Sequence, residues 1–114
     1  MIEYEINKYK IHIYSRQPPE RESPTLAVIT LWFDEKLCGY IHFYPDRTRL
    51  PNPVYENEII RLRFHFTSYF HTIVDILRSE KPLYIDYSEP PPVAILRSGK
   101  EPIGEEERIF HPKE

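Results

Sequence analysis

The sequence predicts an α+β fold: a mostly antiparallel sheet of five to six strands with a single α-helix packed on one face. Two observations favour this class. Apolar and polar residues alternate with a period of two through most of the first two-thirds of the chain, as in half-buried strands. The period changes to 3.6 once, where Phe70, Ile73, Val74 and Leu77 form the stripe of an amphipathic helix.

The first two apolar runs differ in parity, so the chain must change its course near Asn7. Apolar residues occupy even positions from 2 to 6 and odd positions from 9 to 13. Either a bulge or a two-residue hairpin turn through Asn7 and Lys8 explains the change. Asn-Lys lacks the glycine that such turns favour, so we expect a bulge that re-aims one strand.

A central hairpin is predicted from the runs TLAVITLWF and LCGYIHFY, which the charged residues 34–36 connect. A three-residue loop makes one side of the hairpin wholly apolar, whereas a register shifted by one residue would turn every side chain of a strand to the other face. The expected pairs are Phe33 with Leu37, Leu31 with Gly39, Ile29 with Ile41 and Ala27 with Phe43.

The second half of the chain predicts a strand, the helix and two further strands. Residues 59–66 alternate again, with Ile60, Leu62, Phe64 and Phe66 on one face. Thr67 or Ser68 is expected to cap the helix, and Pro82 to stop it. Residues 83–87 and 93–96 then read as short strands, and Pro90 to Pro92 belong in a connection or at a sheet margin.

Length and composition predict a single cytoplasmic domain over residues 1–114, with a flexible tail over 108–114. A net charge of −3 and a pI of about 6.0 make nucleic acid an unfavoured partner. No apolar run is long enough to span a membrane, and the charged N-terminal residues are unlike a signal peptide. Cys38 is the single cysteine, so no disulfide can form within the chain.

Catalytic motifs are not recognisable, so we expect a non-enzymatic protein without a cofactor. Gly99-Lys100 lacks the upstream glycine and the following Ser or Thr of a phosphate-binding loop. Cys38 lies among apolar strand residues and reads as structural rather than nucleophilic. Glu105 to Glu107 lie in the C-terminal segment, where nothing would raise a carboxyl pKa.

The most informative feature is the sheet face that one helix leaves uncovered. Alternation places ten aromatic and basic residues there: Lys10, His12, Tyr14, Trp32, Tyr40, His42, Tyr44, Arg61, Arg63 and His65. Tyr, Trp and Arg are typical anchors of protein interfaces, so we expect self-association as a homodimer, or another protein partner, at this face. The interface residues are expected to be Trp32, Tyr40, Tyr44, Arg61 and Arg63.

Two alternatives use the same face. A small ligand or a metal ion would use His12, His42 and His65, because these imidazoles point to one side if their strands are neighbours. Single-stranded RNA would stack its bases on the tyrosines, although the acidic net charge disfavours it.

The C-terminal third, VDILRSEKPLYIDY followed by LRSGKEPIGEEE, resembles small uncharacterised bacterial proteins. In those the helix ends in a similar Leu-Arg-x-Glu-Lys-Pro turn and the chain closes with a Glu-Pro-x-Gly-Glu pattern. The resemblance implies a shared structural role for Leu77 to Pro82 and for Glu101 to Glu107, and it carries no activity.

Overall fold

The protein folds as eight strands and one helix in the residues that the computed structural model describes, 1–15 and 25–99. The α+β class is thus confirmed. In chain order the elements are β1 (Ile2–Ile6), β2 (Lys8–Ile13), β3 (Ala27–Phe33), β4 (Lys36–Tyr44), β5 (Val54–Glu56), β6 (Ile59–His65), α1 (Phe66–Ser79), β7 (Leu83–Ser88) and β8 (Val93–Ser98).

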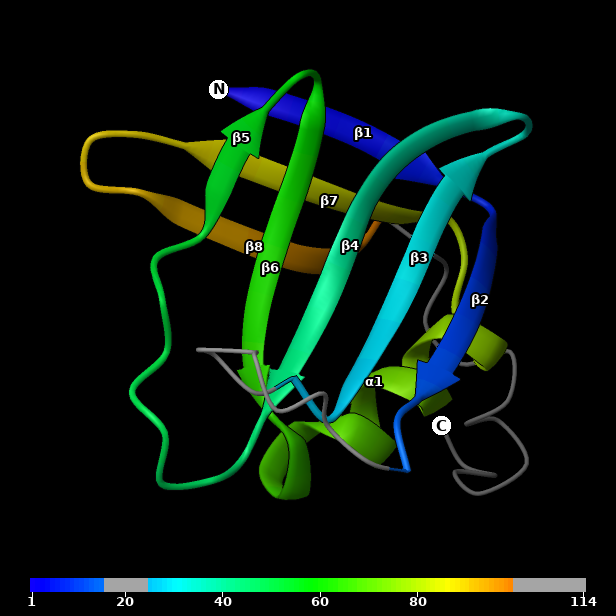
Figure 1. Ribbon diagram of the computed structural model, residues 1–114. Coiled ribbons are helices and arrows are strands. Elements are labelled where there is room, and N and C mark those ends of the chain that lie inside the picture. The colour runs from blue at the N-terminus through cyan, green and yellow to red at the C-terminus, as the bar shows by residue number, and fades with distance from the viewer. Residues whose placement is uncertain (16–24, 100–114) are drawn as a thin grey trace, which may run out of the picture.

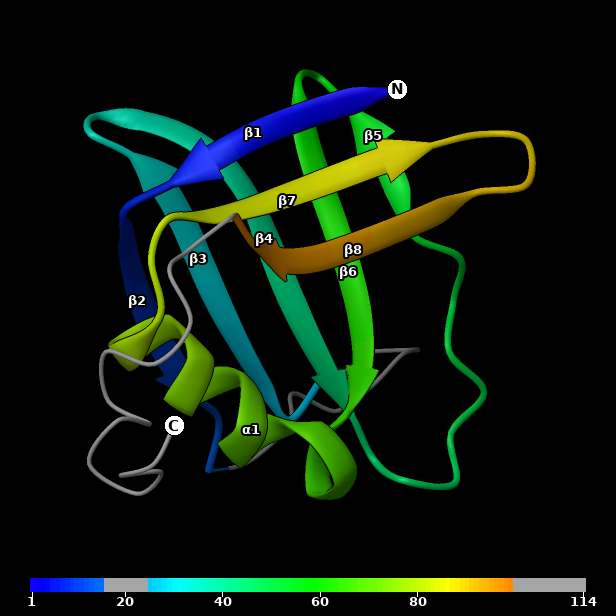
Figure 2. The same cartoon turned by 180° about the vertical axis from the view of Figure 1, so that it is seen from behind.

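The strands form two sheets, where the sequence predicted one. A five-stranded sheet has the order β2-β3-β4-β6-β5, and a three-stranded sheet has the order β1-β7-β8. All neighbours are antiparallel except β4 and β6. The small sheet crosses behind one half of the large sheet, and α1 lies behind the other half (Figures 1 and 2). Both therefore cover the same face, and no helix or strand of the described residues covers the opposite one.

The core lies between the large sheet and these two covering layers. Ala27, Ile29, Leu31, Ile41 and Phe43 are all 0% exposed, and they are the residues that the predicted hairpin register placed on the apolar side. Their pairing, together with that of Leu31 and Gly39, is confirmed.

The tip of that hairpin differs from the prediction. Phe33 pairs with Lys36 and Trp32 with Leu37, so the turn is Asp34–Glu35 and the expected Phe33–Leu37 pair is wrong. The register shifts next to Cys38, which is the extra residue of a bulge. The bulge turns the Cys38 side chain into the core, where it is 1% exposed.

Asn7 is where the chain passes from one sheet to the other, so neither the expected bulge nor the hairpin turn is correct. β1 pairs with β7, and β2 pairs with β3. The parity of the apolar residues changes because each strand faces the core from a different sheet. Asn7 Nδ2 donates to Asp34 Oδ1 at 3.0 Å, and the Asp34 backbone N–H donates to Asn7 Oδ1 at 2.8 Å, which fixes the junction against the hairpin tip.

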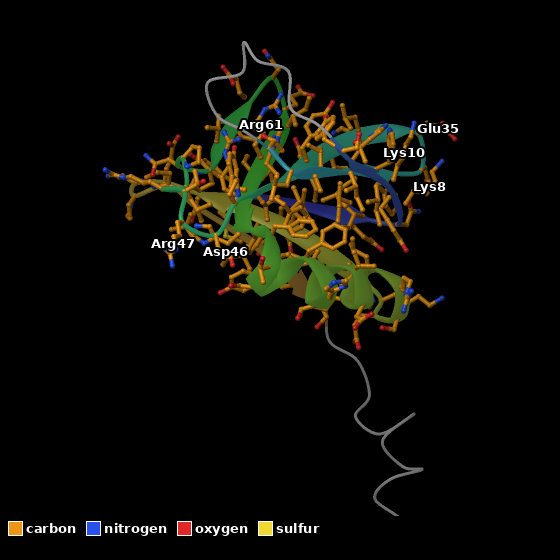
Figure 3. The ribbon with its side chains drawn as sticks, turned by 60° about the horizontal axis from the view of Figure 1, so that its bottom comes forward. Lys8, Lys10, Glu35, Asp46, Arg47 and Arg61 are labelled. Atoms are coloured by element: carbon orange, nitrogen blue, oxygen red, sulfur yellow. The ribbon has the colours of Figure 1, made fainter. Side chains whose placement is uncertain are left out.

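The helix begins one to two residues before Thr67 and Ser68, the expected caps. A backbone N–H of its first turn is hydrogen-bonded by a residue outside the helix. The side chain of the N-cap residue, His65, makes no capping hydrogen bond to the helix. Instead, the Thr67 N–H donates to Asp46 Oδ1 at 3.1 Å, and Asp46 lies beside the start of the helix in Figure 3. The expected apolar stripe is confirmed: Phe70, Ile73 and Leu77 are buried. The helix ends at Ser79, before Pro82 as expected.

β7 and β8 form a hairpin whose loop contains Pro90 to Pro92, so the prolines lie in a connection as predicted. β8 is an edge strand of the small sheet. No helix of the described residues has the length and apolar character of a membrane span. The expected tail, 108–114, and residues 101–107 lie outside the described residues.

Candidate interaction surface on the five-stranded sheet

The candidate site is the face of the five-stranded sheet that points away from the small sheet and α1, which we call the outer face; it is turned toward the viewer in Figure 1. Alternation and pairing place the following residues on it: Lys8, Lys10, His12, Val28, Thr30, Trp32, Tyr40, His42, Tyr44, Arg61, Arg63 and His65. All the residues expected for an interface or a ligand site therefore share one face. Tyr14, which follows β2, donates its N–H to Leu26 O at 3.0 Å and continues that register.

Two arginines of β6 hold the aromatic side chains of β4. The Arg61 guanidinium lies 4.8 Å from the centre of the Tyr40 ring, and its Nη1 is 3.0 Å from His42 Nε2. A guanidinium can only donate, so His42 accepts this bond through an unprotonated Nε2. Arg63 Nη1 donates to the Tyr44 hydroxyl at 3.0 Å. The rings of β4 thus form an ordered row supported from the neighbouring strand.

One end of the outer face is closed by the connection between β4 and β5. Arg63 Nε donates to Asn52 O at 3.2 Å, and His65 Nε2 donates to Thr48 O at 2.8 Å. Tyr44 is only 3% exposed, so its ring is not available to a partner. Its part in the expected interface is to support Arg63. The accessible part of the face contains Trp32, Tyr40 and Arg61, all half-buried.

The three histidines of the ligand alternative do not converge. His42 accepts a hydrogen bond from Arg61, His65 donates one to the 45–53 connection, and His12 is exposed on β2. Across residues 1–15 and 25–99, no group of three His, Cys, Asp or Glu side chains is placed to hold a metal ion. The geometry therefore offers no support for the metal form of that alternative.

The outer face is basic although the chain carries a net charge of −3. Lys8 pairs with Glu35 at 3.2 Å, but their side chains are 50% and 96% exposed, so the pair contributes little. Lys10, Arg61 and Arg63 form no ion pair with any carboxylate in the described part of the chain. Figure 3 shows Lys8, Lys10 and Glu35 together at one corner of the molecule, with Arg61 farther along.

Two hollows that the sequence analysis does not predict flank the start of β2. One, of about 430 Å³, is lined by Asn7, Lys8, Tyr9, Trp32 and Glu35. The other, of about 570 Å³, lies between residues 5–9 and residues 77–83 at the end of α1. The hollow of about 570 Å³ depends on β1 and β2 belonging to different sheets, which alternation alone does not indicate. Neither is lined by His12, His42 or His65.

Cys38 is unsuited to nucleophilic chemistry in this fold. Its side chain points between the sheets, with Sγ 3.8 Å from Glu5 O. Burial raises the pKa of the thiol, which keeps it protonated, and the thiolate is the reactive form.

Comparison of the chain with protein families, with curated proteins and with solved structures finds no match.

Proposed function

We propose that the protein is a non-catalytic interaction module that binds a second copy of itself through the outer face. The observation that carries this proposal is the arrangement of Arg61, which stacks on Tyr40 and donates to His42 without engaging a carboxylate of the described residues. The few residues that carry most of the binding energy at protein interfaces are enriched in Tyr, Trp and Arg.

Pre-organisation makes these side chains suitable anchors. A side chain that is immobilised on binding costs about 0.5–1.5 kcal/mol, and a side chain held in place beforehand avoids much of this cost. Tyr40 and Arg61 are held by each other, and the Tyr40 and His42 rings lie 6.0 Å apart. Val28 and Trp32 continue the half-buried surface across β3.

The charge of the face predicts an unusual salt dependence. A twofold contact between two basic faces brings Lys10 and Arg61 near their counterparts, which opposes association. Salt screens exposed charges, with a Debye length of about 10 Å at 0.1 M and about 3 Å at 1 M. Self-association should therefore strengthen as salt is added, whereas binding of an acidic partner would weaken.

Sedimentation velocity of the whole chain tests the proposal. The double variant Trp32→Ser, Tyr40→Ser should sediment as a monomer at concentrations where the unmodified protein is a dimer. Tyr69→Ser is the matched control, because Tyr69 is 47% exposed on α1, away from the outer face, and its removal should leave the dimer intact. A double variant that keeps the native assembly would count against the proposal, and so would an unmodified protein that stays monomeric.

A further inference from the structure

β2 is the edge strand at one side of the five-stranded sheet. Within residues 1–15 and 25–99 it pairs only with β3. The bond from the Tyr14 N–H to Leu26 O indicates that even-numbered residues of this segment bond to β3. Bonding alternates along an antiparallel pair, so Tyr9, Ile11 and Ile13 direct their N–H and C=O groups away from the sheet. Such an edge is a template for another strand.

The side chains of the same three residues form an apolar row that the core covers only in part, because Ile11 alone of the three packs against it. They lie opposite three residues of β3 that are 0% exposed: Leu31, Ile29 and Ala27. Ile13, by contrast, is 61% exposed and Tyr9 is 36% exposed. An added strand would bring its own apolar side chains beside this row, and each Å² of apolar surface removed from water contributes about 25 cal/mol.

The space beside β2 suits a strand whose side chains point to both faces. The hollow of about 570 Å³ adjoins Tyr9 on the core side, between the β1–β2 junction and the end of α1. The hollow of about 430 Å³ adjoins Lys8 and Trp32 on the outer face. Successive side chains of an added strand would alternate between these two sides.

The outer row of β2 is basic, and this selects the partner. Lys8, Lys10 and His12 project from the same face. In an antiparallel β2–β2 pair of two copies, any register that keeps the apolar rows together sets Lys10 opposite Lys8, Lys10 or His12. Like charges directly opposite each other destabilise a sheet, and lysines on an edge strand discourage such self-pairing. Carboxylates at these positions would instead be opposite-charge partners.

We infer that the β2 edge binds an extended segment of another protein in which acidic residues alternate with apolar ones. The segment adds as a sixth strand to the five-stranded sheet, with its carboxylates beside Lys8 and Lys10 and its apolar side chains beside Tyr9, Ile11 and Ile13. The inference concerns the sheet edge and does not depend on self-association through the outer face.

The test uses an end-capped peptide of about eight residues, a typical strand length, in which glutamate alternates with valine. Fluorescence anisotropy measures binding to the whole chain, and NMR hydrogen exchange locates it. The expected result is binding that slows exchange of the Tyr9, Ile11 and Ile13 amides. A peptide with lysine in place of glutamate should bind at least about tenfold more weakly, because like charges would then lie opposite each other. Tenfold corresponds to about 1.4 kcal/mol.

Two variants of the protein separate charge from backbone pairing. Lys10→Glu should weaken binding of the glutamate peptide by about tenfold, a loss of about 1.4 kcal/mol. Arg47→Glu makes the same charge change on an exposed residue at the other side of the view in Figure 3 and should leave binding unchanged. Ile13→Pro tests backbone pairing: it removes an outward N–H and should therefore weaken binding of the glutamate peptide. It should keep the bonds to β3, because proline is tolerated where the N–H of an edge strand faces solvent.

If circular dichroism shows that Ile13→Pro does not fold, Lys10→Glu and the two peptides still test binding at the β2 edge. Equal binding of the glutamate and lysine peptides would overturn the inference. Exchange protection at Tyr40 and Arg61 instead of β2, or no binding of the glutamate peptide at all, would overturn it as well.

Discussion

The hydroxyl oxygens of Tyr4 in β1 and Tyr55 in β5 lie 3.1 Å apart, so a hydrogen bond joins the small sheet to the large one. Tyr4 donates to Glu58 O at 2.9 Å and therefore accepts from Tyr55. Burial and then the bond with Tyr55 raise the pKa of Tyr4 above its ordinary value. The neutral hydroxyl is thus the form that the fold requires.

This contact predicts how stability changes in alkali. The folded state holds the Tyr4 proton more tightly than the unfolded state, so the contribution is fully present below the ordinary tyrosine pKa of about 10 and is lost as pH rises above it. Tyr4→Phe should lower the free energy of unfolding by about 0.5–1.5 kcal/mol at neutral pH. It should then lose less stability than the unmodified protein between about pH 9 and 11. Thermal unfolding curves that fall in parallel for both proteins would contradict this assignment.

Gly39 is required by the close approach of β4 to its neighbours. A Cβ atom at this position would lie 2.5 Å from Ile60 O and 2.8 Å from Ile85 Cδ1. Overfilling a packed core typically costs about 1–3 kcal/mol, so Gly39→Ala should lower the free energy of unfolding by at least that range. Urea unfolding of Gly39→Ala beside Ser88→Ala, an exposed position of β7, provides the measurement and its control. Equal midpoints for the two variants would show that the sheets can separate without cost.

Asp46, and not Thr67 or Ser68, is the residue that caps α1. Loss of a helix N-cap costs about 0.5–2 kcal/mol, so Asp46→Ala should destabilise the protein by that amount. Thr67→Ala and Ser68→Ala, both exposed, should be nearly neutral because their side chains do not cap the helix. The comparison needs only chemical unfolding of three single variants. A larger loss in Thr67→Ala than in Asp46→Ala would restore the cap expected from sequence.

Arg97 compensates a buried carboxylate on the small sheet. Asp86 is 7% exposed, and its Oδ2 accepts from Arg97 Nε at 2.6 Å. This bond raises the pKa of Arg97, which also pairs with Glu3. Removing one partner of a buried pair leaves an uncompensated charge, whereas exposed pairs contribute little. Arg97→Gln should therefore lower the melting temperature clearly more than Arg78→Gln, which removes the exposed pair with Asp75.

Equal melting temperatures for Arg97→Gln and Arg78→Gln would mean that Asp86 is hydrated when Arg97 is absent. Asp86→Asn combined with Arg97→Gln distinguishes the two cases. If the charge is the cause, the double variant should recover part of the stability that Arg97→Gln loses, because the buried group is then neutral.

The helix, the composition of the outer face and the strands other than β5 could be predicted from sequence because each depends on local periodicity, whereas the three residues of β5 are too few to show one. Alternation identified β6, and the apolar pairing of Ile29 with Ile41 fixed the register of β3 and β4. The change of parity at Asn7 was a correct signal with the wrong interpretation. Periodicity shows that the core-facing side of the chain changes at this point. It does not show that the strand before it belongs to a second sheet.

What the sequence did not predict depends on contacts between distant residues. Asp46 reaches the helix from 21 positions before Thr67, so no local cap rule identifies it. Tyr44 follows the alternation onto the outer face, but it is buried at the end that the 45–53 connection closes. The bulge at Cys38 follows from the two-residue turn at Asp34–Glu35, whose φ of 53° at Asp34 is a conformation that alternation does not specify.

Self-association through the outer face can be followed by amide chemical shifts in a dilution series of the unmodified protein. We predict concentration-dependent shifts that cluster on Trp32, Tyr40 and Arg61 and are absent from β7 and β8, with the monomer favoured at low salt. Shifts confined to the small sheet, or none over a concentration range of about a hundredfold, a span of about 2.7 kcal/mol in association free energy, would contradict it.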